Sequence, residues 1–179
     1  MKQAIDSLKA GGIIAYPTEA VYGLGCDPLN KKAVLRLLAL KKRSWEKGLI
    51  LIAADFAQLQ PFLKPLSPML EKRVFAEWPG PVTWLLAAKS TVPYWLCGQY
   101  EKLAVRVTAH PKAVELCQQW GGALVSTSAN LSGQAAAKTA FDVEQFFAKT
   151  IDYIVEGAVG ERKRPSEIRD ALTNRVLRV

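Results

Sequence analysis

Short apolar runs that alternate with amphipathic segments constrain the fold of this chain more than any other feature of its sequence. The alternation continues from end to end, without an internal repeat or a low-complexity linker. Runs typical of strands occupy residues 13–16, 48–53, 82–87, 103–107, 123–126 and 151–155, and residues 167–172 and 175–179 are expected to pair as a terminal hairpin. The pattern predicts an α/β fold with at least seven strands.

Capping residues, glycine and proline mark where the helices begin and end. The expected helices are an opening one that ends at Gly11-Gly12, one from Asn30 to Lys41-Lys42-Arg43, a short one from Asp55 to Pro61, and others from Ser67, over 111–120 and from about Thr139. The motif Trp78-Pro79-Gly80-Pro81 predicts a rigid turn. Cations at a helix C-terminus suit the helix dipole, so this effect alone could explain the basic cluster at 41–43.

The length of 179 residues favours one domain over residues 1–179, because one core can bury about two-thirds of such a chain's unfolded surface. No apolar run reaches the roughly 18 residues that span a bilayer, and the N-terminus lacks a signal-like segment. We therefore expect a cytoplasmic protein without a membrane partner. Cys26, Cys97 and Cys117 form no C-x-x-C pair, which predicts buried thiols and no metal site.

The net charge of +8 is concentrated in two segments. Residues 31–47 hold seven basic side chains and one acidic one, and residues 161–179 hold six basic and three acidic. Two basic segments on a near-neutral body are typical of a surface for polyanions such as nucleotide phosphates or RNA. Two solvated charge runs without a ligand explain the same charges equally well.

Several familiar catalytic motifs are missing from the sequence. It contains no G-x-x-x-x-G-K-[ST] motif, and Gly23-Leu24-Gly25 lacks the third glycine of a dinucleotide fingerprint. His110 is the single histidine and precedes Pro111 at an expected helix start, which favours a structural or solvent-facing role over catalysis. P-loop NTPases and Rossmann dehydrogenases are therefore disfavoured.

Three polar segments at the ends of expected strands and helices are candidates for a ligand site. Residues 16–25 combine Thr18 with a carboxylate, aromatic rings and glycines. The motif Lys41-x-Arg43 offers two cations of different shape for phosphate oxygens. Residues 126–133 carry four hydroxyl groups and the Asn130 amide, which is a denser polar set than a turn requires.

Arg106 lies within an expected apolar strand, where an unpaired charge would be costly. It should therefore meet a carboxylate, which belongs either to the protein or to a ligand.

These segments, in this order, resemble the YrdC family, and the resemblance covers nearly the whole chain. The matching blocks are residues 14–23, Lys41-x-Arg43, 47–52, 78–83, 103–107, 126–133 and 165–172. The resemblance implies a single-domain YrdC-like fold, with a twisted open sheet of parallel and antiparallel strands, flanking helices and a basic concave face.

The same resemblance implies an activity. Family enzymes convert L-threonine, bicarbonate or CO2, and ATP, with Mg2+ carried by ATP, to threonylcarbamoyl-adenylate and diphosphate. This is the first step of threonylcarbamoyladenosine formation at position 37 of tRNA, and the product passes to a tRNA threonylcarbamoyl-transferase complex.

The family's motifs fall on particular residues of this chain. The signature Lys-x-Arg with Ser-x-Asn implies Lys41, Arg43, Ser128 and Asn130 as catalytic residues. The implied threonine-binding residues are Thr18, Arg106, Ser128 and Ser166, and the implied ATP-binding residues are Lys41, Arg43, Asn130 and Arg178. Longer relatives carry an Asn and a His where this chain has Trp45 and a residue near Ile52. A non-catalytic module that binds tRNA or double-stranded RNA remains the alternative interpretation.

Overall fold

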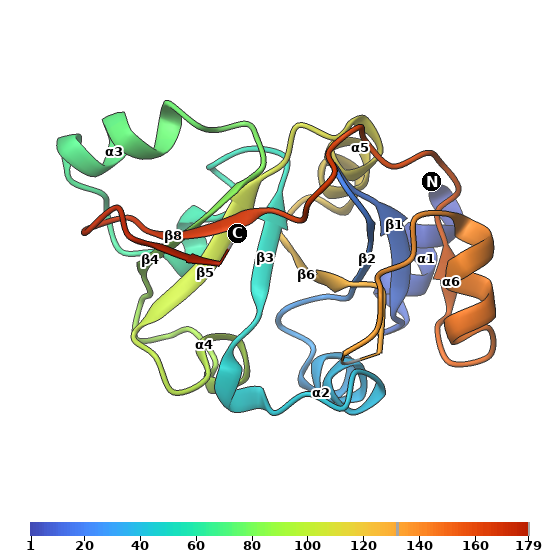
Figure 1. Cartoon of the computed structure of the whole chain (residues 1–179). Coiled ribbons are helices and arrows are strands. Elements are labelled where there is room, and N and C mark those ends of the chain that lie inside the picture. Colours follow the sequence, from blue (N-terminus) through green and yellow to red (C-terminus); the bar gives the residue numbers. More distant parts are fainter. Residues whose placement is uncertain (132, 179) are drawn as a thin grey trace.

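The computed structural model describes residues 1–131 and 133–178, which form a twisted sheet with helices on both of its faces (Figure 1). The strands are β1 (Ile14–Pro17), β2 (Tyr22–Gly25), β3 (Ile50–Ala53), β4 (Val82–Ala87), β5 (Lys102–Val107), β6 (Leu124–Ser128), β7 (Tyr153–Ile154), β8 (Glu167–Asp170) and β9 (Val176–Arg178). The helices are α1 (Lys2–Lys9), α2 (Lys31–Leu40), α3 (Pro68–Phe75), α4 (Tyr94–Cys97), α5 (Pro111–Trp120) and α6 (Ala140–Phe147), with 3-10 turns η1 (Trp45–Lys47) and η2 (Gln60–Phe62).

The strand order is β7-β1-β2-β6-β3-β5-β4-β8-β9. The pairs β1/β7, β3/β5 and β4/β8 are parallel, and the other neighbouring pairs are antiparallel. The predicted α/β fold with an open mixed sheet is therefore confirmed, and β8 and β9 form the expected terminal hairpin. That residues 1–179 make one domain stays a prediction, which the continuous sheet supports.

Helices cover both faces of the sheet because side chains alternate along each strand. On β1, Ile14 and Tyr16 pack with the inward residues of α1 and α5, whereas Ala15 faces the other core. That second core takes in the apolar residues of α2 and α6, including Leu37 and Val143. The helices pack on the faces of the sheet, so the ends of the strands are available to form a site.

Capping groups set the helix boundaries as predicted. The Asn30 carboxamide accepts a hydrogen bond from the Ala33 backbone N–H, at 3.1 Å, and so begins α2. Thr139 and Asp142 form a capping box at the start of α6. Gly121 ends α5 with a φ of 82°, a conformation that favours glycine.

The helix predicted between Asp55 and Pro61 is wrong. Asp55 caps only a single turn, by accepting a hydrogen bond from the Gln58 backbone N–H. The Gln58 side chain then satisfies the Ala54 N–H and the Cys117 carbonyl, so the local polar groups are paired without a helix.

Two further boundaries differ from the prediction. The residues of β2 form a strand where the sequence suggested a loop. Of the expected strand 151–155, only Tyr153 and Ile154 form β7, which pairs with Ile14 and Ala15 of β1. The flanking Asp152 and Val155 N–H groups still donate to the Ile13 and Ala15 carbonyls, each at 2.8 Å.

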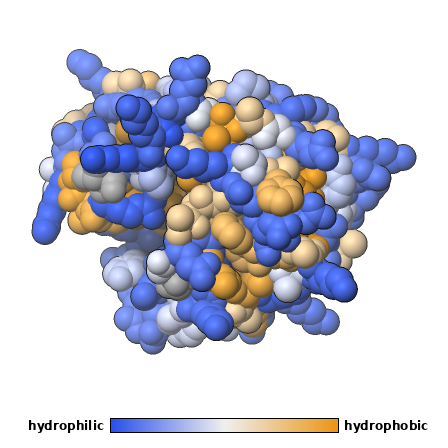
Figure 2. Space-filling model, turned by 45° about the vertical axis from the view of Figure 1, so that its right-hand side comes forward, coloured by the Kyte–Doolittle hydropathy of each residue, from blue (hydrophilic) through white to orange (hydrophobic). Residues whose placement is uncertain are grey.

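The surface is dominated by hydrophilic side chains on the face shown in Figure 2, with apolar groups between them. Exposed apolar residues of the chain include Phe141 and Phe146 on α6. No helix within the described ranges is long and apolar enough to cross a membrane.

The three cysteines are buried, as predicted, and burial raises the pKa of Cys26 and of Cys117 to about 12.

Candidate functional site

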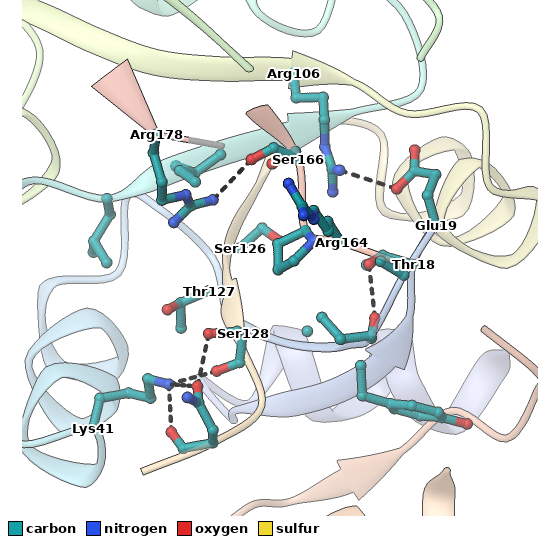
Figure 3. A pocket seen from close by; sticks show the side chains of 18 of the residues that line it. Thr18, Glu19, Lys41, Arg106, Ser126, Thr127, Ser128, Arg164, Ser166 and Arg178 are labelled. Carbon is teal, nitrogen blue, oxygen red and sulfur yellow. Dashed lines mark hydrogen bonds and ion pairs between the residues drawn. The ribbon is translucent and has the colours of Figure 1, made fainter. Parts of the chain in front are cut away.

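A pocket lies where the β1–β2 turn, the end of α2, the end of β6 and the C-terminal hairpin meet (Figure 3). Its lining contains every residue that the sequence assigned to the site: Thr18, Lys41, Arg43, Arg106, Ser128, Asn130, Ser166 and Arg178. Segments far apart in the sequence therefore converge on one cavity. Which substrate each side chain binds stays a prediction.

Lys41 is the C-terminal cap of α2, and its side chain is only 5% exposed. Its ammonium group does not bind the carbonyls of its own helix. It donates instead to the backbone carbonyls of Ser128, at 2.5 Å, and Asn130, and to Asn130 Oδ1, at 2.7 Å. Lys41 therefore joins α2 to the segment that follows β6.

The polar groups after β6 are ordered by the same contacts. The Ser128 hydroxyl donates to Asn130 Oδ1, at 2.7 Å, and the Asn130 amide donates to the Gln134 carbonyl, at 2.6 Å. Asn130 thus accepts from both Lys41 and Ser128 through a single oxygen. The dense polar set seen in the sequence is a connected network at the pocket wall.

Burial, and then the charge of Arg43, lower the pKa of Lys41 to about 8. The Arg43 guanidinium donates to the Gly48 carbonyl, at 3.0 Å, and its Nε is buried without a hydrogen-bond partner among the described residues. Two cations held this close create a strongly positive wall, which an anion would relieve.

Arg106 has its carboxylate within the protein, since its Nη1 lies 3.0 Å from Glu19 Oε2. Glu19 Oε1 also accepts hydrogen bonds from the Thr108 hydroxyl, at 2.7 Å, and from the Ala109 N–H, at 3.1 Å. Burial alone would raise the pKa of the Glu19 carboxyl, but Arg106 and these donors outweigh it and hold the pKa below its usual range. Glu19 is therefore an ionised support for Arg106.

The remaining predicted residues line the pocket from two sides. The Thr18 hydroxyl donates to the Val21 carbonyl, at 2.7 Å, which fixes the β1–β2 turn. Across the cavity, the Ser166 hydroxyl accepts from Thr83, at 2.9 Å, and the Ser166 carbonyl accepts from Arg178, at 3.1 Å. Partial desolvation, and then the charges of Arg43 and Arg106, lower the pKa of Arg178.

Other residues singled out in the sequence lie outside this lining. Trp45 packs edge-on against Tyr94, with ring centroids 5.1 Å apart, and Ile52 is fully buried in the core. His110 is buried at the start of α5, and its Nε2 lies 3.1 Å from the Ala158 carbonyl. Of the two roles that the sequence favoured for His110, structural or solvent-facing, its burial supports the structural one.

Sequence reasoning missed several pocket residues. Glu19 received no role, although the need of Arg106 for a carboxylate was a signal for it. Lys47, Arg162 and Arg164 also line the pocket. Lys42 is exposed and also contributes to the lining.

Among the residues that the structure describes, no group of three or more His, Cys, Asp and Glu side chains could hold a metal ion. The pocket instead offers cations, hydroxyl groups and one ionised carboxylate. The fold and the pocket together define an α/β protein with a cavity lined by cations.

Residues 6–179 match the model of the Sua5/YciO/YrdC family, which is described as "Telomere recombination". The chain belongs to this family, as the resemblance of its motifs predicted.

Two relatives that match this chain over almost their full length carry the same enzyme name. The threonylcarbamoyl-AMP synthase of Nitrosococcus oceani is 56% identical over 178 residues, which are 99% of this chain and 96% of that protein. The protein of that name from Coxiella burnetii is 48% identical over 179 residues, with 100% and 96% covered.

Solved structures share the fold. Sua5 of P. abyssi complexed with L-threonine matches with a TM-score of 0.87 and 32% identity, over 93% of this chain and 49% of that one. The chain thus spans about half the length of that Sua5 protein. E. coli YciO matches with a TM-score of 0.87 and 25% identity, over 98% of this chain and 86% of YciO.

Proposed function

We propose that this chain is a nucleotidyltransferase that makes threonylcarbamoyl-AMP from L-threonine, bicarbonate or CO2, and ATP. The observation that carries the proposal is 56% identity over almost the full length to a threonylcarbamoyl-AMP synthase, together with a pocket that gathers the predicted residues. The activity is the first step of threonylcarbamoyladenosine formation at position 37 of tRNA.

The chemistry requires two steps. The threonine ammonium group loses one proton, the free amine adds to the carbon of CO2, and the nitrogen loses a second proton to give a carbamate. When bicarbonate is the source, the free amine bonds to its carbon and one water molecule leaves. A carbamate oxygen then attacks the α-phosphorus of ATP, and the bond from this phosphorus to the bridging oxygen breaks to release diphosphate. Holding three substrates in line contributes on the order of 7 kcal/mol to such a reaction.

The threonine part of the proposal centres on Arg106, which Figure 3 shows paired with Glu19 on the side of the pocket away from Lys41. Arg106, supported by Glu19, binds the threonine carboxylate, and Thr18, Ser128 and Ser166 supply neutral hydrogen-bonding groups around the amino acid. The buried Nε of Arg106 has no hydrogen-bond partner in the described ranges, so the guanidinium keeps a donor for this ligand.

The nucleotide part of the proposal uses other cations of the pocket lining. Arg43 and Arg178 bind phosphate oxygens, and Asn130 supports the nucleotide beside Lys41. The positive charge of Lys41 then stabilises the phosphates of ATP in one of two ways. It acts through the loop that Lys41 holds, or by direct contact once ATP displaces one of the oxygens to which Lys41 donates. Mg2+ enters with ATP as part of the substrate.

A second function rests on charge. The basic segments at 31–47 and 161–179 support affinity for tRNA or double-stranded RNA, either as an accessory property of the enzyme or as the whole function of a non-catalytic module. In the enzymatic case the product passes to a tRNA threonylcarbamoyl-transferase complex in the cytoplasm.

Diphosphate release separates the two functions. The purified protein with ATP, Mg2+, threonine and bicarbonate is expected to release diphosphate only when all four are present, and Arg43→Ala is expected to abolish the release while the fold persists. Turnover of ATP without threonine, or tight RNA binding with no diphosphate formed, would refute the synthase proposal.

A further inference from the structure

The segment from residue 155 to residue 166, called the strap below, crosses the molecule. It joins β7 to β8, which lie near opposite ends of the sheet order. Figure 1 shows the strap running from the side of α6, past α5, to the C-terminal hairpin of β8 and β9. The connection therefore runs across the strand ends where the pocket lies.

Backbone contacts fix the strap against the pocket wall. The Gly160 N–H donates to the Thr18 carbonyl, at 2.9 Å, and the Arg162 N–H donates to the Glu19 carbonyl, at 3.1 Å. A Cβ atom at Gly160 would lie 2.7 Å from the Glu19 carbonyl oxygen, so only glycine permits this approach. The strap is thus positioned by the same turn that holds Thr18 and Glu19.

Four strap residues line the pocket, and two of them, both arginines, are charged. Arg162 and Arg164 line it, whereas Lys163 between them does not. Figure 3 shows Arg164 within the cavity, close to Ser166. Neither arginine makes a side-chain hydrogen bond or ion pair to the described part of the chain.

The charge of the pocket exceeds what its own acid can balance. Among the described lining residues Glu19 is the one carboxylate, and Arg106 already pairs with it. The other lining cations are Lys41, Lys42, Arg43, Lys47, Arg162, Arg164 and Arg178. Zwitterionic threonine has no net charge and bicarbonate carries one negative charge, so the triphosphate of ATP is the substrate group whose charge matches this excess.

We propose that Arg162 and Arg164 bind the triphosphate of ATP and complete the nucleotide site from the strap. The inference rests on the proposed function. A guanidinium group forms paired hydrogen bonds with phosphate oxygens, and the strap places two such groups in the lining of the pocket that also holds Arg43 and Lys41.

The test compares Arg162→Gln, Arg164→Gln and the double variant with Lys163→Gln, the matched control from the same strap. Each arginine variant is expected to raise the KM for ATP about tenfold, since a charged hydrogen bond is lost. The KM values for threonine and bicarbonate are expected to stay within about twofold, and Lys163→Gln is expected to match the wild type. Unchanged thermal unfolding midpoints would show that the fold is kept.

Calorimetric titration with ATP and with adenosine keeps this inference separate from the proposed function. The double variant should lose affinity for ATP but not for adenosine, even if the wild type forms no threonylcarbamoyl-AMP. An unchanged affinity for ATP in the double variant, an equal loss for adenosine, or a rise in the threonine KM alone would overturn the role of the strap arginines.

Discussion

The Lys41 ammonium group donates to both oxygens of Asn130, the backbone carbonyl and Oδ1, the latter at 2.7 Å. Its third hydrogen bond goes to the Ser128 carbonyl. An ammonium group has three N–H donors, so all of them are used within the protein. The lysine that the family signature assigns to ATP therefore also shapes the loop that carries Ser128 and Asn130.

Replacement of Lys41 by Met should affect stability as well as activity. It leaves three oxygens near the pocket without their donor, so we expect the free energy of unfolding to fall by about 1–3 kcal/mol. The measurement is urea denaturation, and diphosphate release is expected to be lost in parallel. Lys42→Met, at the exposed neighbouring position, is the control and should leave stability unchanged. Loss of activity with full stability would show that Lys41 does not hold the loop.

The pH dependence of ATP binding should reflect Lys41. Because the pKa of this group is lowered to about 8, its positive charge is lost as the pH rises through 8. The KM for ATP is therefore expected to rise above pH 8 in kinetics measured between about pH 6.5 and 9.5. A KM that stays constant across this range would contradict the assignment.

Whereas ATP binding should weaken above pH 8, the contribution of Lys41 to the stability of the fold should increase there. The unfolded chain keeps Lys41 protonated up to its ordinary pKa of 10.5, so between pH 8 and 10.5 the unfolded state binds more protons than the native state. The contribution of Lys41 to the free energy of unfolding should thus increase with pH in this window. Urea denaturation of the wild type and of Lys41→Met, at about pH 7.5 and 10, measures this difference, which should grow at the higher pH.

The variant Glu19→Gln tests whether Glu19 holds Arg106 in position for threonine binding. The carboxamide removes the negative charge beside a buried guanidinium, and loss of one partner from a buried pair costs about 3 kcal/mol. We expect lower stability and a KM for threonine raised about tenfold, with the KM for ATP little changed. The control is Glu161→Gln, an exposed carboxylate on the strap that does not line the pocket. An unaltered KM for threonine in Glu19→Gln would contradict the proposal that Arg106, held by Glu19, binds threonine.

Much of the fold was predictable because its signals are local. Apolar strands, the cap at Asn30 and the stop at Gly121 depend on a few neighbouring residues, and each was found. The helix from Asp55 failed because the Gln58 side chain reaches the Cys117 carbonyl, a contact between residues far apart in the sequence. The strand β2 was hidden because two of its four residues are glycines, which weaken the strand signal.

The site was predictable only in part, for the same reason. Motif matches brought together Lys41, Arg43, Ser128 and Asn130, but no local pattern indicates that the strap crosses the pocket. That position follows from β7 and β8 lying near opposite ends of the sheet order. Likewise, the sequence predicted a carboxylate for Arg106 without showing that Glu19, in a distant turn, supplies it.

The central claim is that this pocket joins a threonine carbamate to AMP. Mass spectrometry of the reaction with ATP, Mg2+, threonine and 13C-labelled bicarbonate tests it most directly. The account predicts a threonylcarbamoyl-AMP ion that is heavier by one mass unit than the ion formed from unlabelled bicarbonate, and that is absent when threonine is omitted. An adenylate without the 13C label, or nucleotide products that form equally without threonine, would contradict the account.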